Sequence, residues 1–223
     1  MNILVTGIAG DIGNGIGRIL RDSGLITKLI GCDIHDQHMG QFIFDTCKLV
    51  PKANEQSYTE ALLTIAKEYD VDAIVPTSEP ELRFFSKQGI SQYIDGMPLV
   101  MANMKALEVG FDKLKTADFL AKHNFPFPWT TTVAANEPKE LPCIMKSRFG
   151  AGSKEVRLIN DYELVPFYRK IFPEHIWQEC VGTADEEYTC GLYRSMTGEV
   201  RSIVFRRRLS AGFTTYGEVV ANP

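Results

Sequence analysis

The chain has 223 residues, of which 44% are hydrophobic and 23% are charged, and its formal net charge is −4 at neutral pH. This length accommodates one large domain or two small ones with the composition of an ordinary globular protein. A net negative charge gives no general attraction to nucleic acid or to an anionic membrane. We find no membrane-spanning apolar stretch and no N-terminal leader, and the cysteines lack C-x-x-C spacing. We therefore expect a cytoplasmic protein with neither nucleic-acid nor membrane partners.

The first apolar run, Met1–Val5, predicts a buried strand that leads into a glycine-rich turn. Gly7, Gly10 and Gly13 lie in this turn, and the isoleucines that follow recur at helical spacing. Such a turn can hold a phosphate at the helix N-terminus, but a helix packed closely on a strand needs glycines there as well. Asp33 ends the next apolar run, where a dinucleotide-binding fold places its ribose-binding acid. Nucleotide binding and simple architecture are both compatible with this pattern.

Up to about residue 103, apolar runs alternate with helical patterns. A capping box at Ser57–Glu60 predicts a helix through Tyr69, and a second helix is predicted from Glu79 to Gln88. Strands are predicted at residues 2–6, 28–34, 72–76 and 97–101. This alternation is typical of a parallel sheet with helices on its faces. Residues 103–111 read as a junction.

The second half of the chain has a different pattern. Asp112 is predicted to cap a helix that the proline-rich FPFPWT segment ends. From Thr130 onward, short strands joined by glycine turns predict an antiparallel sheet. We predict strands at residues 130–133, 143–147, 155–159, 176–181, 187–193 and 200–208, and one helix near 161–171.

A glycine loop, RFGAGSK, joins two of these strands within CIMKSRFGAGSKEVRLI, residues 143–159. A flexible hairpin turn is one interpretation. Lys146 favours another, because it lies inside an apolar strand and its charge needs a partner if that face is buried. A glycine loop can fold over an anion while a lysine on the strand reaches the same charge.

Several segments, in their order and spacing, resemble the ATP-grasp family, in the branch related to carbamoyl phosphate synthase large chains and similar carboxylate–amine ligases. These segments are ILVTGIAGDIGNGI, FDTCKLVP, DVDAIVPTSEPEL, FDKLKTADFLAKHNFPFP, MKSRFGAGSKEV, WQECVGTADEEYTCGLY and RRRLSAGFTTYGEVV. The resemblance implies an α/β fold: a Rossmann-like parallel-sheet domain over residues 1–108, then an α+β ATP-grasp domain with antiparallel sheet over 109–223, C-terminally incomplete. It also implies that ATP binds in the second domain. The first glycine turn would then be architectural or would line the acceptor-substrate side.

The resemblance implies a set of phosphate-binding residues. Lys113 and Lys146 match lysines that reach the nucleotide phosphates, and Gly150, Gly152 and Ser153 match the loop that covers them. Without the resemblance, Lys113 would be read as a solvated lysine on a helix surface.

Other residues match the remaining parts of the nucleotide site. The backbone of Glu179 and Val181 would pair with the adenine edge, and Glu187 would accept hydrogen bonds from the ribose hydroxyls. Arg208 is the catalytic candidate, contacting the transferred phosphate. The competing interpretation of Glu187 is a solvated acidic turn, and that of Arg208 is an exposed basic strand.

The function implied is the ATP-binding portion of a ligase that joins a small-molecule carboxylate to an amine, or to a thiol, through an acyl phosphate. ATP and Mg²⁺ are the implied cofactors, and a homodimer is possible. After Glu199 the only carboxylate side chain is that of Glu218, so metal ligands are expected beyond residue 223 and this stretch alone is expected to be inactive. A non-catalytic nucleotide-binding module is the alternative. An NAD(P)-dependent epimerase or reductase is disfavoured, because none of the 8 tyrosines has a lysine four positions later.

Overall fold

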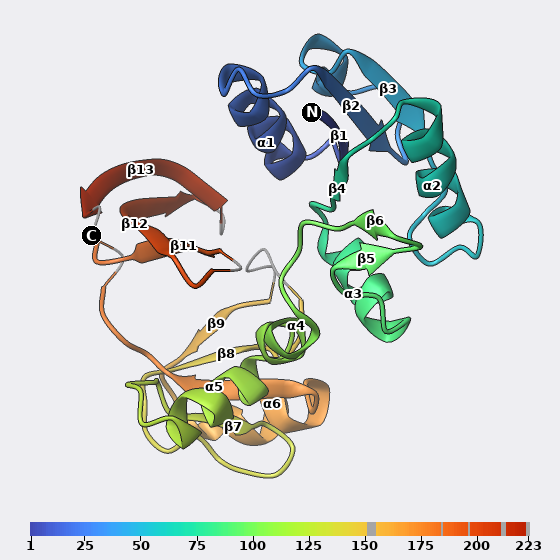
Figure 1. Cartoon of the computed structure of the whole chain (residues 1–223). Coiled ribbons are helices and arrows are strands. Elements are labelled where there is room, and N and C mark those ends of the chain that lie inside the picture. The colour runs from blue at the N-terminus through green and yellow to red at the C-terminus, as the bar shows by residue number, and fades with distance from the viewer. Residues whose placement is uncertain (151–154, 184, 196, 211–212, 222–223) are drawn as a thin grey trace. The chain divides into compact units, whose positions relative to one another are not determined.

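The structure is a computed structural model that describes residues 1–150, 155–183, 185–195, 197–210 and 213–221 (Figure 1). The chain divides into two compact units, Met1–Glu108 and Val109–Pro223. Among the helices described, none has the length and apolar character needed to cross a membrane.

The first unit is built on a parallel four-stranded sheet in the order β3-β2-β1-β4. Its strands are β1 (Asn2–Thr6), β2 (Lys28–Asp33), β3 (Thr46–Leu49) and β4 (Ala73–Val75). The expected strand at 97–101 is shorter than predicted. A two-stranded hairpin, β5 (Tyr93–Ile94) with β6 (Met97–Pro98), takes its first residues, and beyond it Leu99 makes an isolated parallel bridge to Ile74.

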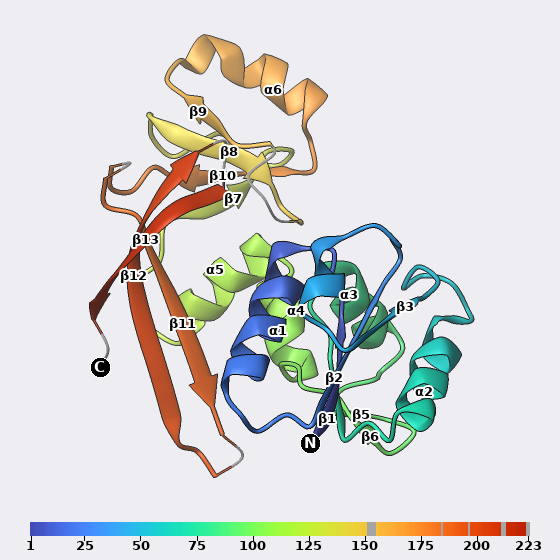
Figure 2. The same cartoon turned by 90° about the horizontal axis from the view of Figure 1, so that it is seen from above.

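Helices cover both faces of this sheet, as the Rossmann-like prediction requires. Figure 2 shows α1 (Asp11–Asp22) and α2 (Tyr58–Glu68) on opposite sides of the strands. One core cluster joins Leu4 to α2 and to α3 (Glu79–Lys87). The other joins Ile3 to α1 and to Ile43 and Phe44, which follow the short 3-10 helix η1 (Met39–Phe42). The α/β class of the first unit is therefore confirmed.

Two local predictions for the first unit are wrong. Ser57 does not cap α2, because its backbone is already helical (φ −78°, ψ −6°) and its side chain makes no capping hydrogen bond. The capping box lies instead at Ser78 and Glu81, at the start of α3. Residues 103–111 are not a simple junction but contain the helix α4 (Met104–Gly110), whose first turn is capped by Asn103 Oδ1 accepting from the N–H of Ala106 at 3.0 Å.

The second unit begins with α5 (Lys113–Lys122), capped by Asp112 as predicted. An antiparallel sheet follows in the order β7-β10-β8-β9. Its elements are β7 (Thr130–Thr132), β8 (Cys143–Ser147), β9 (Arg157–Ile159), η2 (Tyr162–Leu164), α6 (Val165–Ile171) and β10 (His175–Glu179). Cys143 and Met145 of β8 enter a core with Trp177, so alternation along the strand turns Lys146 to the other face.

A second antiparallel sheet ends the chain, with β11 (Tyr188–Arg194), β12 (Val200–Ser210) and β13 (Phe213–Ala221) in that order. The strand β13 was not predicted. Its pairing with β12 shifts register between Val204 and Phe205 and again between Arg208 and Leu209. Such irregularities interrupt the two-residue alternation that sequence analysis relies on.

Candidate functional site

Two lysines from separate elements of the second unit approach each other. Lys113 is the first residue of α5, and Lys146 lies half-buried on β8. Burial lowers the pKa of Lys146, and the positive charge of Lys113 lowers it further. Two ammonium groups close enough to repel one another would both be stabilised by an anion bound between them.

The start of the glycine loop joins this lysine pair. Lys113 Nζ donates to the carbonyl of Gly150 at 2.8 Å, and the backbone N–H of Lys113 donates to the carbonyl of Arg148 at 3.1 Å. Gly150 has φ +84°, a conformation that favours glycine, and no atom of the described residues lies within 4 Å of the position that a Cβ would take. The structure thus brings together Lys113, Lys146 and Gly150, while Gly152 and Ser153 lie outside the described residues.

The strand expected to hold adenine has one backbone group already engaged. Glu179 ends β10; its N–H donates to the carbonyl of Trp129 at 2.9 Å, and its Oε2 accepts from the N–H of Trp129 at 3.1 Å. Val181 lies two residues past the strand and is 71% exposed. An adenine edge at this strand would therefore use groups other than the N–H of Glu179.

Glu187 and Arg208 lie on opposite faces of the second antiparallel sheet. The N–H of Arg207 donates to the carbonyl of Glu187 at 2.8 Å, and Glu187 Oε2 is 3.4 Å from Arg207 Nε. Side chains alternate along β12, so Arg208 faces away from Arg207. The structure does not bring these two predicted site residues together.

Arg208 instead lines a cavity of about 640 Å³ with Asp185, Arg206, Tyr216 and Glu218. Arg206 and Glu218 form an ion pair at 2.7 Å across β12 and β13. Sequence analysis missed this grouping because it depends on the register of β13. In the structure Arg206 pairs with Glu218 and Arg208 with Tyr216. A prediction of β13 in this register would have found the grouping.

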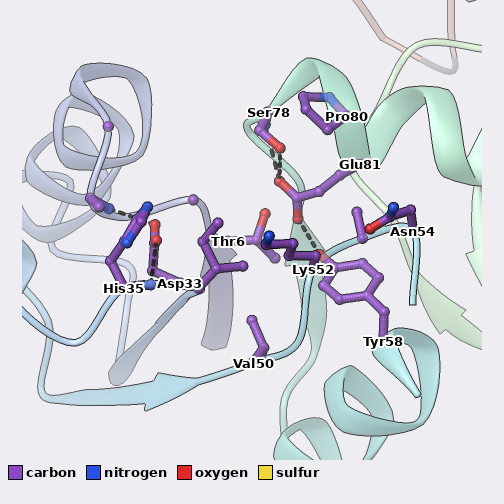
Figure 3. A pocket seen from close by; sticks show the side chains of 15 residues that line it. Thr6, Asp33, His35, Val50, Lys52, Asn54, Tyr58, Ser78, Pro80 and Glu81 are labelled. Atoms are coloured by element: carbon purple, nitrogen blue, oxygen red, sulfur yellow. Dashed lines mark hydrogen bonds between the residues drawn. The ribbon is translucent and has the colours of Figure 1, made fainter. Parts of the chain in front are cut away.

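The first unit has a cavity of about 750 Å³ at the carboxyl ends of β1, β2 and β4 (Figure 3). The buried carboxylate of Asp33 lies in its wall. Asp33 Oδ2 accepts from the N–H of Ala9 at 2.8 Å, and Oδ1 accepts from the N–H of His35 at 3.0 Å. Asp33, at the position where a dinucleotide-binding fold places its ribose-binding acid, therefore stabilises the glycine turn by accepting a hydrogen bond from it.

Close packing explains two glycines of this turn. Gly7 has φ +62°, and an added Cβ would lie 2.7 Å from Oγ1 of Thr77. A Cβ at Gly13 would overlap the carbonyl oxygen of Gly7 and lie 2.9 Å from Cα of Ile8. These contacts support the architectural interpretation of the turn.

A second buried carboxylate, Glu81, lies in the wall of the same cavity. It accepts hydrogen bonds from the Tyr58 hydroxyl and from both the hydroxyl and the N–H of Ser78 (Figure 3). Burial, and then the charge of Glu81, raise the pKa of Tyr58 far above its usual range. Tyr58 is therefore a permanent donor to Glu81, which ties α2 to α3.

With this geometry in view, the chain was compared with known proteins. Residues 25–100 match the family described as PylC-like, N-terminal domain, and residues 111–185 match the family described as ATP-grasp domain. The second unit is therefore similar to ATP-grasp domains. Its lysine pair and Gly150 lie within the matched range.

Similar proteins include a carbamoyl-phosphate synthase of Methanobrevibacter smithii, which is 23% identical over an alignment of 176 residues. The match covers 75% of this chain and 44% of the relative. Among solved structures, N5-carboxyaminoimidazole ribonucleotide synthetase in complex with ADP superposes with a TM-score of 0.71 at 15% identity, covering 96% of this chain and 55% of that protein. An L-amino acid ligase from Bacillus licheniformis has a TM-score of 0.62 at 16% identity, covering 94% and 51%. These likenesses show the fold, and the chain spans about half the length of each protein.

The described part of the second unit offers no ready site for a metal. No group of three or more His, Cys, Asp or Glu side chains is placed to hold a metal ion in the residues that the structure describes. Magnesium needs several oxygen ligands in near-octahedral geometry. The described residues do not supply such a ligand set by themselves.

Proposed function

We propose that this chain is the ATP-binding portion of an ATP-dependent ligase that joins a carboxylate to an amine or a thiol. The observation that carries the proposal is the convergence of Lys113 and Lys146 beside Gly150 within an ATP-grasp domain. Support also comes from the fold, which is shared with a synthetase solved with ADP and with an L-amino acid ligase. We assign residues 1–108 to the domain that precedes ATP-grasp and residues 109–223 to the N-terminal portion of the ATP-grasp domain.

In this proposal the lysine pair holds the phosphate chain of ATP. The ammonium groups of Lys113 and Lys146 supply charge-assisted hydrogen bonds, and the loop that begins at Arg148 and includes Gly152 and Ser153 covers the phosphates. The charge of Lys113 lowers the pKa of Lys146, and the negative charge of a phosphate chain beside both lysines would favour their charged forms.

The adenine would lie at the end of β10. Adenine presents an amino donor beside ring-nitrogen acceptors. Because the N–H of Glu179 is engaged by Trp129, we assign the carbonyl of Glu179 to the amino group and the N–H of Val181 to the ring nitrogen. Glu187 would accept from the ribose hydroxyls. Arg208 lies on the other face of that sheet, so ATP would have to pass the edge of the sheet for Arg208 to contact the transferred phosphate.

The reaction proposed is transfer of the γ-phosphoryl group of ATP to the carboxylate, which releases ADP and yields an acyl phosphate. The amine or thiol then attacks the acyl carbon and displaces phosphate. Phosphoryl transfer depends mainly on positioning and on stabilising the developing negative charge. Lys113, Lys146 and Arg208 would supply fixed positive charge for this.

The direct test is ATP affinity after Lys146→Ala, measured by titration calorimetry. Removing one charge-assisted contact should weaken ATP binding by roughly 10- to 150-fold, the equivalent of about 1.5–3 kcal/mol. Lys122→Ala is the matched control, because Lys122 is an exposed lysine at the far end of α5. Equal ATP affinity in the Lys146→Ala variant and the parent would contradict the assignment.

A further inference from the structure

An ion pair between Arg148 and Asp112 ties the start of the glycine loop to the start of α5. Arg148 donates through Nε to Oδ1 of Asp112 at 2.8 Å and through Nη2 to Oδ2 at 2.7 Å. Two parallel bonds of this kind give an arginine–carboxylate pair both strength and a fixed orientation. Asp112 is only 4% exposed, so solvent and salt screen the pair weakly.

The same carboxylate also caps α5. Asp112 Oδ1 accepts from the N–H of Leu114 at 3.0 Å and of Lys115 at 3.4 Å. Burial alone would raise the pKa of Asp112, but the hydrogen bonds from Arg148 and from the Lys115 N–H lower it on balance, so the carboxyl group is ionised. Serine or asparagine would cap a helix as well. The forked bond to Arg148 is therefore an additional feature that helix capping does not require.

Lys113 lies directly beside this pair and contacts the same loop. Its N–H donates to the carbonyl of Arg148, and its Nζ donates to the carbonyl of Gly150. Side-chain and backbone contacts thus connect the first residues of α5 with residues 148–150. If Arg148 moved, the backbone that orients Lys113 and the loop would lose its anchor.

We propose that the Asp112–Arg148 pair is a positioning device for the phosphate site, which holds Lys113 and the loop start in the arrangement that receives a phosphate chain. This inference rests on the proposed function, because the phosphate chain is that of ATP. Asp112 neutralises Arg148, so the pair acts through geometry rather than through net charge. Neither residue is a catalytic residue.

The test compares Arg148→Met with the parent protein, using ATP and adenosine as separate probes in calorimetry. Methionine keeps an unbranched apolar stem and leaves Asp112 free to cap α5. We expect ATP affinity to fall about tenfold, as for the loss of a charge-assisted network, and adenosine affinity to stay unchanged. Arg169→Met is the matched control, since the partners of Arg169 are Glu137, at 3.8 Å, and the carbonyl of Ala134, at 3.1 Å, rather than Asp112 or the glycine loop.

A second variant and a second measurement keep the test decisive if Arg148→Met folds poorly. Arg148→Lys keeps the charge but cannot form two parallel bonds, so its ATP affinity should also fall. Without nucleotide, the amide of Lys113 should exchange its hydrogen faster in either variant, because its acceptor is the carbonyl of Arg148.

Parent-like ATP affinity in Arg148→Met, an equal loss for ATP and adenosine, or unchanged exchange at Lys113 would each overturn the proposal. Failure of the proposed function looks different, because then the parent itself would not bind ATP.

Discussion

The chain contains two glycine turns that each follow a strand, and the structure surrounds them with opposite chemistry. In the turn after β1, the carboxylate of Asp33 accepts the N–H of Ala9, and protein atoms fill the space beside Gly7 and Gly13. In the turn after β8, no described atom lies within 4 Å of the position that a Cβ of Gly150 would take, and the carbonyl of Gly150 accepts from Lys113. The negative side chain of Asp33, which is bonded to the first turn, opposes the binding of a phosphate there, whereas the lysines beside the second turn attract a phosphate. Glycine spacing alone does not distinguish these two uses.

The largest effect is expected from adding a methyl group to the first turn, which tests whether that turn is closely packed. Gly13→Ala should destabilise the first unit by about 3 kcal/mol, because the new Cβ would overlap backbone atoms that cannot move freely. Gly15→Ala is the control: nothing lies within 4 Å of that Cβ, and alanine should stabilise the helix by about 0.5–1 kcal/mol. Urea unfolding followed by circular dichroism measures both variants. Equal stability of the two would show that the first turn is not closely packed.

The second prediction concerns the carboxylate that fastens the first turn. Asp33→Ala leaves the N–H groups of Ala9 and His35 without their partner and should destabilise the protein by about 2 kcal/mol. Asp36→Ala, at an exposed position, should change stability little. Neither the parent nor the Asp33→Ala variant should bind NADH saturably in a fluorescence-transfer titration. Tight NADH binding that depends on Asp33 would restore the nucleotide interpretation of the first turn.

The smallest expected effect is a pH dependence at the second turn. The lowered pKa of Lys146 means that it loses its charge at a lower pH than the ordinary lysine value of 10.5. ATP affinity should therefore fall, by about tenfold at most, as pH rises through that lowered pKa toward 10.5. Arg148 retains its charge over this range because its pKa is raised by Asp112, and Lys146→Arg should remove the pH dependence because arginine stays protonated. Calorimetry over this range checks both proteins, and a parallel loss of affinity in Lys146→Arg would assign the effect to another group.

Local signals in the sequence predicted several elements correctly. The strand over residues 2–6 and the Asp112 cap are confirmed. The two Ser-x-x-Glu patterns at Ser57 and Ser78 look alike in sequence, but only Ser78 is extended (φ −108°, ψ 144°) and forms the box. Ser78 follows the extended strand β4, whereas Ser57 follows a turn and its own backbone is already helical. The preceding chain, which the pattern does not contain, decides which serine caps.

The candidate site was less accessible to sequence analysis. Its phosphate-binding residues followed from resemblance, because no spacing rule brings the start of α5 beside β8. The consecutive arginines at 206–208 show the other limit. A shift of one residue in register would exchange the faces on which Arg207 and Arg208 lie, and register is set by pairing with distant strands.

Both tryptophans of the chain, Trp129 and Trp177, belong to the second unit. Trp177 is fully buried in the core behind β8, and Trp129 is hydrogen-bonded to Glu179 at the end of β10. Light that excites tryptophan selectively therefore reports on the second unit alone, and the tyrosines of the first unit do not contribute. The chain thus carries an intrinsic optical probe beside its proposed adenine strand, and a titration with nucleotide can be read without attaching a dye.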